Sequence, residues 1–468
     1  MRKTLSCIVL AALAAGCAST PPPPPQLDLP AATAGDLQLD RWWTAFGDPT
    51  LDGLVAEALA NNLDLKAAIT RVEYGRALVL LAQSDQYPTV DLSAGAARDR
   101  STQVGSNPLP PGFSPLSTDL SVGLQASYEA DLWGKYRNAT AAARDDLLAT
   151  EYAREVVRTI VAADTARGYF NLLAADAQLQ LLLDTLKLRD ETVALQKDRY
   201  EGGVIGEYDL RTAEAERAAV AGDVALARRV RSEYESALAV LLGRSPREVF
   251  APSIARDLAV ARLTAVPTLP AGVPSDLLAR RPDIRRAEAQ LAAGNLRIDV
   301  ARADYYPSIS LTGSYGTQAG ALSNLFSGPG VVWGIAASLL QPLIGLRRIE
   351  ANVDAQTARR DELVVLYTQT VQSAFRDAHD ALSANDTTRE ALAAQNERRV
   401  KLQQALELSD LRYRAGYSPY LEVLDAQRQL LQAQTLEIVA ARNVRLALVD
   451  FAKAAGGGWD YRTSVAQP

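Results

Sequence analysis

The sequence predicts a mixed α and β protein: a long α-helical barrel plus a transmembrane β-barrel, both completed by trimerisation and built from an internal two-fold repeat. Three observations support this fold class, namely long runs without proline, four alternating segments of strand length, and a series of motifs that occurs twice. Apolar residues make up 48% of the 468 residues but aromatic residues only 6%, which is typical of long helices packed closely together. The net charge of -6 argues against nucleic acid as a partner.

The internal repeat is visible in four pairs of motifs that follow the same order in both halves. Four matches in one order indicate a duplication rather than chance. We therefore expect a first repeat at 51–243 and a second at 276–449, each with a helix, two strands, a long helix, a turn and a further helix. The matching segments are Asn62–Ala68 with Arg281–Ala287, Tyr87–Val90 with Tyr306–Ile309, Leu132–Gly134 with Leu343–Gly345, and Arg199–Gly203 with Arg412–Gly416.

Proline placement predicts where the long helices run. No proline occurs between Pro115 and Pro246 or between Pro342 and Pro419, and a proline inside a helix costs about 3 kcal/mol. The stretch Tyr136–Glu201 is expected to form a helix of about 100 Å, at about 1.5 Å per residue. Turns are expected at about 202–208 and 415–419, before the last helix of each repeat.

Four segments are predicted as strands, at about 88–97 and 118–131 in the first repeat and about 307–316 and 331–341 in the second. Leu120, Val122 and Leu124, for example, alternate with Ser121 and Gly123. Alternating runs of about 9–11 residues have the length and pattern of strands that cross a bilayer. The loops within the two hairpins, at 98–117 and 317–330, are expected outside the cell because they lie opposite the helices.

The number of strands predicts oligomerisation. Four strands are too few to close a barrel, and an open sheet edge in lipid leaves backbone groups unsatisfied. Two copies would give eight strands, whose interior is filled by side chains, whereas three copies would give twelve strands around a water-filled lumen. We therefore expect a homotrimer in contact with outer-membrane lipid.

The N-terminus is typical of a secreted lipoprotein. Two basic residues precede the apolar run Leu5–Ala15, so that 1–16 is expected to be a signal peptide. Leu13–Cys17 resembles the bacterial lipobox, in which the cysteine is acylated with fatty acids such as palmitate; an ordinary signal peptide cut nearby is the alternative. The run Pro21–Pro25 suits a stiff tether. Ala18 stands where an aspartate would retain a lipoprotein at the inner membrane, which favours the outer membrane.

Several motifs along nearly the whole chain resemble one known family. They include Trp42-Trp43, Arg280–Ile284, Tyr306-Pro307, Arg412-Tyr413 with Gly416, and Leu424–Gln427. The chain resembles the TolC-like outer-membrane efflux lipoproteins, the NodT-type outer-membrane factors of resistance-nodulation-division pumps. The resemblance implies an outer-membrane channel of a tripartite efflux pump that exports drugs or other small toxic molecules. Its partners would be a periplasmic adaptor and an inner-membrane transporter, and no cofactor is implied. Equatorial segments would come from 17–50, 244–275 and 450–468.

The resemblance also assigns candidate residues to the two turns. A periplasmic gate would be formed by Arg412, Tyr413, Leu421 and Asp425, with Asp209 in the corresponding place of the first turn. We expect Arg412 to pair with Asp425 on the partner helix or the adjoining subunit. The alternative is that Arg412 and Tyr413 only end a helix and that Asp425 lies on a solvated face. The turns that would dock the adaptor contain Arg199, Tyr200, Gly203, Gly416 and Tyr420.

Other function classes find little support in the sequence. The single histidine, His379, gives no catalytic triad or metal site, and no phosphate-binding glycine loop is present. The chain is therefore predicted not to be an enzyme. A coiled-coil lipoprotein that bridges envelope layers is one alternative. The same duct in a type I protein-secretion system or a metal-ion efflux pump is the other.

Overall fold

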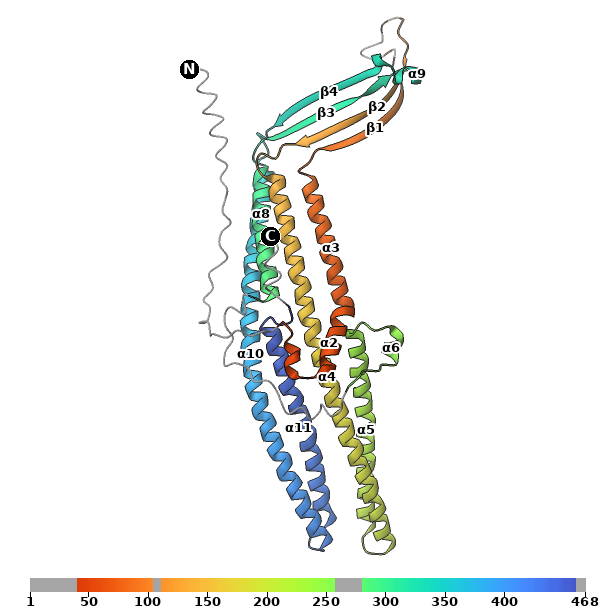
Figure 1. Ribbon diagram of the computed structural model, residues 1–468, viewed down its shortest axis with the longest axis vertical. Coiled ribbons are helices and arrows are strands. Elements are labelled where there is room, and N and C mark those ends of the chain that lie inside the picture. The colour runs from red at the N-terminus through yellow and green to blue at the C-terminus, as the bar shows by residue number, and fades with distance from the viewer. Residues whose placement is uncertain (1–39, 103, 105–109, 111, 257–279, 460–468) are drawn as a thin grey trace, which may run out of the picture. The chain divides into compact units, whose positions relative to one another are not determined.

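The computed structural model describes residues 40–102, 104, 110, 112–256 and 280–459 (Figure 1). The described chain divides into two compact units. Unit 1 contains Glu73–Thr150 and Ala287–Tyr367, and unit 2 contains the described parts of Gln26–Val72, Glu151–Arg286 and Thr368–Pro468. The expected signal peptide, Cys17 with its tether, most of the linker 244–275 and the end of the segment 450–468 lie outside the described residues.

Unit 1 contains one antiparallel sheet of four strands in the order of the chain. The strands are β1(Thr89–Arg100), β2(Leu116–Glu129), β3(Ser308–Ala319) and β4(Val331–Leu340). The prediction of loop at 98–117 was wrong at its two ends, because Asp99 pairs with Ser117 and Arg100 with Leu116. Hydrogen bonding along the backbone thus continues beyond the alternating stretch. The second hairpin carries the short helices α9(Leu322–Leu325) and η3(Gly328–Gly330).

The register of the strands separates apolar from polar residues. Residues directly opposite each other in an antiparallel pair share a face. One face therefore contains the pairs Leu92 with Leu124, Ile309 with Leu339 and Tyr315 with Trp333. The other face contains Asp91 with Gln125, Ser127 with Thr312 and Ser310 with Ser338. The predicted alternation is thus clear in β1, β2 and β3 and weaker in β4, whose polar face also contains Val332 and Leu340.

Long helices make up most of the remaining structure, so the predicted combination of long helices and strands is confirmed. Equal or nearly equal lengths occur in both halves: 22 residues in α3 and α8, 67 and 68 in α4 and α10, and 35 in α5 and α11. These helices are α3(Leu63–Ser84), α4(Lys135–Glu201), α5(Glu207–Leu241), α8(Pro282–Ala303), α10(Arg347–Arg414) and α11(Tyr420–Ala454).

Small residues allow close helix packing in unit 1. A Cβ atom at Gly294 of α8 would lie 2.8 Å from Leu363 Cδ1 of α10, and one at Gly75 of α3 would lie 3.1 Å from Leu147 Cδ1 of α4. An ion pair between Arg297 and Asp146 adds a polar link between α8 and α4. The two glycines therefore allow the neighbouring helices to pack closely side by side.

The core of unit 2 forms around the N-terminal segment η1(Trp42–Phe46) and the helix α2(Pro49–Asn61). Trp42 and Phe46 are buried, and Phe46 packs on Phe170 of α4 at 4.9 Å between ring centroids. Asp48 caps α2 by accepting a hydrogen bond from the Thr50 amide at 2.9 Å. Its other carboxylate oxygen accepts a 2.6 Å hydrogen bond from the buried Tyr169 hydroxyl. A buried carboxylate is stable there because it is fully bonded.

Two equivalent contacts fix the ends of α5 and α11 in unit 2. Asn62 Nδ2 donates to the Leu241 carbonyl at 2.9 Å, and Arg281 Nη1 donates to the Ala454 carbonyl at 3.0 Å. A glycine with positive φ then ends each helix, Gly243 at 68° and Gly456 at 74°. The short helix α6(Pro246–Phe250), which begins with a Ser-Glu capping box, follows the first of these ends.

Candidate functional site

The two helix-pair turns of unit 2 have the same backbone construction. In the first, Gly203 has φ 68° and donates to the Tyr200 carbonyl at 2.9 Å, while the Val204 amide donates to the Arg199 carbonyl at 2.8 Å. In the second, Gly416 has φ 79°, and its amide bonds to the carbonyl of Tyr413 at 3.0 Å. This arrangement is the Schellman motif, which needs a residue that tolerates positive φ. The repeated Arg-Tyr-x-x-Gly sequence is thus explained in part by helix termination.

The side chain of Tyr413 links the two long helices near these turns. Its hydroxyl accepts hydrogen bonds from Arg199 Nη1 at 2.7 Å and from Gln196 Nε2 at 3.2 Å. The Arg199 guanidinium also lies 5.2 Å from the centre of the Tyr413 ring, within reach of a cation–π interaction. The buried ring of Tyr420 packs beside it at 5.8 Å. Residues assigned from the sequence to gating and to adaptor docking therefore contact one another.

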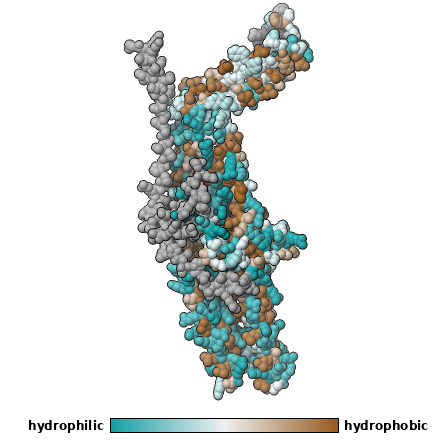
Figure 2. Space-filling model, viewed as in Figure 1, coloured by the Kyte–Doolittle hydropathy of each residue, from teal (hydrophilic) through white to brown (hydrophobic). Residues whose placement is uncertain are grey.

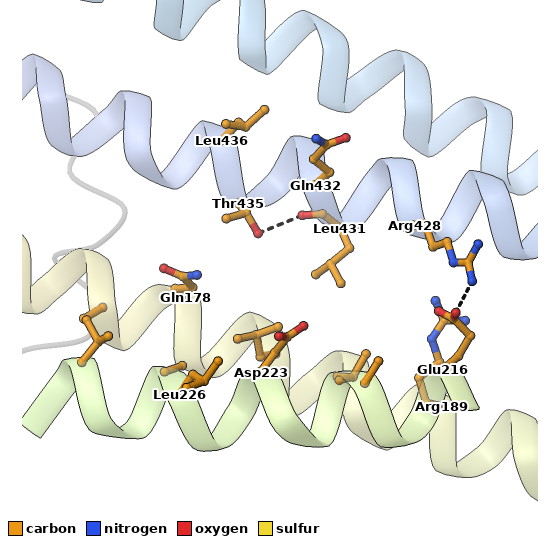
Figure 3. Close-up of a pocket in the computed structure, with 16 residues that line it drawn as sticks. Gln178, Arg189, Glu216, Asp223, Leu226, Arg428, Leu431, Gln432, Thr435 and Leu436 are labelled. Atoms are coloured by element: carbon orange, nitrogen blue, oxygen red, sulfur yellow. Dashed lines mark hydrogen bonds and ion pairs between the residues drawn. The ribbon is translucent and has the colours of Figure 1, made fainter. Parts of the chain in front are cut away.

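A second set of links above the turns was missed by the sequence analysis. Arg189 of α4 hydrogen-bonds to Gln427 of α11. Arg428 of α11 pairs with Glu216 of α5, as Figure 3 shows. Arg189 is only 2% exposed. Gln427 belongs to a motif singled out from the sequence, whereas no local pattern marked Arg189 or Glu216. Three helices are therefore connected here by charged side chains.

The surroundings of these charged groups alter their proton affinity. Burial lowers the pKa of Arg189, although the nearby Tyr420 and Glu216 oppose this effect. The hydrogen bond from Arg428 lowers the pKa of Glu216, while partial burial acts in the opposite direction. Burial raises the pKa of Tyr420, with Arg189 opposing it. At neutral pH both partners of the Arg428–Glu216 pair are therefore charged.

The expected pair of Arg412 and Asp425 does not form within the protomer. Arg412 Nη2 lies 4.0 Å from Glu422 Oε2, and Asp425 accepts a 2.5 Å hydrogen bond from Gln429 on its own helix. Asp209 is the third residue of α5, just as Glu422 is the third residue of α11. The prediction that Asp209 corresponds to Asp425 was therefore wrong, because the helix starts fix a different alignment.

The remaining predicted residues of the turns differ in exposure. Leu421 is 55% exposed and Tyr200 is 41% exposed, so both can contact another molecule. Gly203 and Gly416 lie at the exposed ends of the turns. Tyr420, in contrast, is only 6% exposed and is covered by Tyr413. Tyr420 thus supports the second turn from inside.

The sheet of unit 1 offers an apolar surface without a covering layer. On its apolar face Leu92 is 73% exposed, Trp333 72% and Ile335 84%, and hydrophobic residues are visible along the sheet in the space-filling view (Figure 2). Contiguous apolar surface of this kind indicates contact with lipid or protein. Within the described residues, β1 pairs only with β2 and β4 only with β3, so both outer edges retain unpaired backbone groups.

Other kinds of site find no support among the residues that the structure describes. No three His, Cys, Asp or Glu side chains in the described ranges are arranged to hold a metal ion, and His379 is exposed beside Asp380. A search of the described helices finds none with the length and apolar character needed to cross a membrane.

Comparisons with known proteins relate the chain to one family. The family described as outer membrane efflux protein matches residues 54–244 and 273–457. The solvent efflux pump outer membrane protein SrpC of Pseudomonas putida is 34% identical over 414 residues, which cover 88% of this chain and 86% of the relative. The cation efflux system protein CusC of Escherichia coli K12 is 32% identical over 427 residues, or 91% and 90% of the two chains.

Solved structures give the same result. The Campylobacter jejuni CmeC outer membrane channel matches with a TM-score of 0.86 and 27% identity, over 94% of this chain and 97% of that chain. The resemblance inferred from the sequence motifs is thereby confirmed. The chain therefore belongs to the outer membrane efflux protein family.

Proposed function

We propose that this chain forms the outer-membrane channel of a tripartite efflux pump and exports drugs or other small toxic molecules through a trimeric duct across the periplasm. The observation that carries the proposal is the sheet, whose register sorts one apolar face from one polar face and whose two outer edges are unpaired. Strands with this alternation suit a lipid-facing barrel wall with a wet interior. The name of the CusC relative supports metal-ion efflux as a second candidate.

Three copies would complete the wall. The edge strand β1 of one copy could pair in antiparallel fashion with the edge strand β4 of the next copy. Pairing of this kind around a closed ring of copies would leave no open sheet edge. Three copies give twelve strands, enough for a lumen. The equal lengths of the helix pairs, and the equivalent contacts of Asn62 and Arg281 at the ends of α5 and α11, support an origin of the two halves by duplication.

The turns would serve docking and closure in this channel. Arg199, Tyr200, Gly203 and Gly416 would form the rim that a periplasmic adaptor contacts, with an inner-membrane transporter beyond it. Leu421 and Asp425 are exposed on the first turns of α11, where three-fold symmetry would repeat each of them around an axis. A ring of Leu421 side chains would exclude water. Asp425 of one copy would form an ion pair with Arg412 of the adjoining copy, not with Arg412 of the same copy.

Conductance in planar bilayers tests this proposal. The purified full-length protein should insert as a species of three chains and conduct ions through a single pore, because the polar face of the sheet would line the lumen. The measurement is single-channel current together with the mass of the detergent-solubilised oligomer. A trimer that never conducts would favour the coiled-coil lipoprotein alternative, and a stable monomer in the bilayer would contradict the completed barrel.

Lipidation of Cys17 is a separate prediction. Cells fed labelled palmitate should incorporate label into the wild-type chain and none into Cys17→Ser, because the thiol is the group that receives lipid. The variant should still form trimers in the outer membrane, since the barrel rather than the lipid would carry conduction. Label that persists in Cys17→Ser would show that the lipobox interpretation is wrong.

A further inference from the structure

The two arginines of the four-stranded sheet lie on its apolar face. Arg98 and Arg100 continue the alternation of Leu92 along β1, and the residues opposite them in β2 are Thr118 and Leu116. Both arginine side chains are exposed, and neither takes part in an ion pair or hydrogen bond within the described part of the chain. The apolar face of β1 thus ends in two positive charges that no described side chain compensates.

Negative charges in the strands are confined to the opposite face. Side chains on the two faces of a strand point away from each other, so the carboxylate of Asp99 does not neutralise Arg98 or Arg100 beside it. An anion that approaches the apolar face at this end of β1 therefore meets two cations and no carboxylate of the sheet. The acidic residues of the four strands, all on the polar face, are Asp91, Asp99, Asp119 and Glu129.

The position of the two arginines along the strand indicates which layer of a membrane they would meet. β1 begins just after α3, so Thr89 is near the helix and Arg100 is at the far end of the strand (Figure 1). From Leu120 to Tyr128 the apolar stretch of β2 is about 27 Å long, which a tilt of about 40° reduces to about 20 Å of the apolar band of about 25 Å. Arg98 lies just beyond this stretch, at the end away from the helices. In the proposed channel the arginines would therefore lie among the headgroups of the outer leaflet.

We propose that Arg98 and Arg100 bind a phosphate group of a phosphorylated glycolipid in the outer leaflet of the outer membrane. Their Cα atoms are about 6.6 Å apart on one strand face, so that both guanidinium groups can reach one phosphate, and each offers two parallel donors to it. The exposed Thr118 adds a hydroxyl donor, and Leu116, which is 48% exposed, adds apolar surface for an acyl chain. The site rests on the proposed orientation of the channel, but binding can be measured without conduction.

Two forms of one lipid separate recognition of phosphate from apolar binding. Lipid A with two phosphates and enzymatically dephosphorylated lipid A have the same sugars and acyl chains. The purified full-length protein in neutral detergent is titrated with each fluorescent lipid, with empty micelles as the blank. It should bind the phosphorylated form saturably and the other form about tenfold more weakly. Arg98→Gln, Arg100→Gln should lower the affinity for the phosphorylated form about tenfold, or about 1.4 kcal/mol, and leave the affinity for the other form unchanged.

Two further variants separate the site from a general loss of charge. Arg229→Gln, Arg359→Gln removes two exposed arginines outside the sheet, which pair with glutamates on their own helices, and should bind both lipids like the wild type. Arg98→Lys, Arg100→Lys keeps both charges but loses the parallel donors of the guanidinium. Its affinity for the phosphorylated form should therefore lie between those of the wild type and the glutamine variant.

Several results would overturn the site. These are equal binding of the two lipids by the wild type, wild-type affinity in the Arg98→Gln, Arg100→Gln variant, an equal loss in the Arg229→Gln, Arg359→Gln control, or a lysine variant no better than the glutamine variant. Phosphatidylglycerol that competes as well as phosphorylated lipid A would assign the arginines to anionic lipids in general and overturn the glycolipid site.

The outcomes for the lipid site and for the channel are independent. A protein that prefers the phosphorylated lipid but never conducts would contradict the proposed channel and leave the site in place. A conducting oligomer that does not distinguish the two lipids would contradict only the site.

Discussion

A Tyr413→Phe, Glu216→Gln double variant should conduct three- to tenfold more current than the wild-type channel. Tyr413→Phe removes the hydroxyl that accepts hydrogen bonds from Arg199 and Gln196. Glu216→Gln removes the charge that Arg428 neutralises. Hydrogen bonds to charged groups contribute about 1.5–3 kcal/mol each, and the proposed trimer would contain three copies of each link. Single-channel recordings would measure the change, and sensitivity of cells to large antibiotics would follow it.

Low pH should weaken the Arg428–Glu216 ion pair, which the Glu216→Gln substitution also removes. The hydrogen bond from Arg428 lowers the pKa of Glu216 in the structure, so the link is intact above the usual pKa of a glutamate and weakens as pH falls below it. Acidification on the periplasmic side should therefore raise conductance in the wild type. Glu216→Gln should lose this part of the response.

A control substitution on α5 tests whether loss of the Tyr413 and Glu216 contacts causes the rise in conductance. Glu233 pairs with Arg229 within α5, where both side chains are exposed, so that Glu233→Gln should leave conductance unchanged. Asp425→Ala tests the contact proposed between copies and should raise conductance without lowering trimer yield. Wild-type conductance in the Tyr413→Phe, Glu216→Gln variant would show that closure does not depend on links inside the protomer. A response to Asp425→Ala alone would then assign closure to the ring.

A Gly243→Ala substitution should prevent folding of unit 2. Gly243 has φ 68°, and a Cβ atom there would lie 2.2 Å from the Asn61 carbonyl oxygen. Backbone atoms on both sides would have to move, and Asn62 next to this carbonyl holds the end of α5. We expect the free energy of unfolding to fall by more than about 4 kcal/mol, which only exceptional substitutions reach. The measurement is the yield of protease-resistant trimer in the outer membrane.

The second turn supplies the comparison for this prediction. Gly416 has φ 79°, but a Cβ atom there would meet nothing within 4 Å. Gly416→Ala should therefore lower the free energy of unfolding only by the cost of a left-handed alanine, about 1–2 kcal/mol. Trimer yield should stay near the wild-type value, while the midpoint of thermal unfolding should fall. Equal yields for the two variants would contradict the role given to the Asn61 contact.

The fold was largely predictable because the alternation of its strands and the absence of proline from its long helices are local features of the sequence. Alternation predicted that Leu120, Val122 and Leu124 share one face of β2, and the absence of proline predicted α4 and α10. The strand ends were less predictable. Backbone pairing of Arg100 with Leu116 does not require an alternating pattern.

The contacts of the candidate site were less predictable because they join distant parts of the chain. Arg189 and Gln427 are 238 positions apart, and nothing in the sequence near either residue specifies the other. Inside the protomer the expected pairing of Arg412 with Asp425 was wrong, because Arg412 lies next to Glu422 in the first turn of α11 instead.

The open edges of the four-stranded sheet also bear on how the protein reaches its membrane. In a bilayer core each unsatisfied backbone group costs several kcal/mol, so a single copy gains little by inserting β1 to β4 alone. Insertion and association would then form one cooperative step, whose rate rises more steeply than the concentration of newly exported chains. Until that step, the exposed face around Trp333 and Ile335 is prone to aggregate in water. Biogenesis at low expression should accordingly depend on a periplasmic holding chaperone.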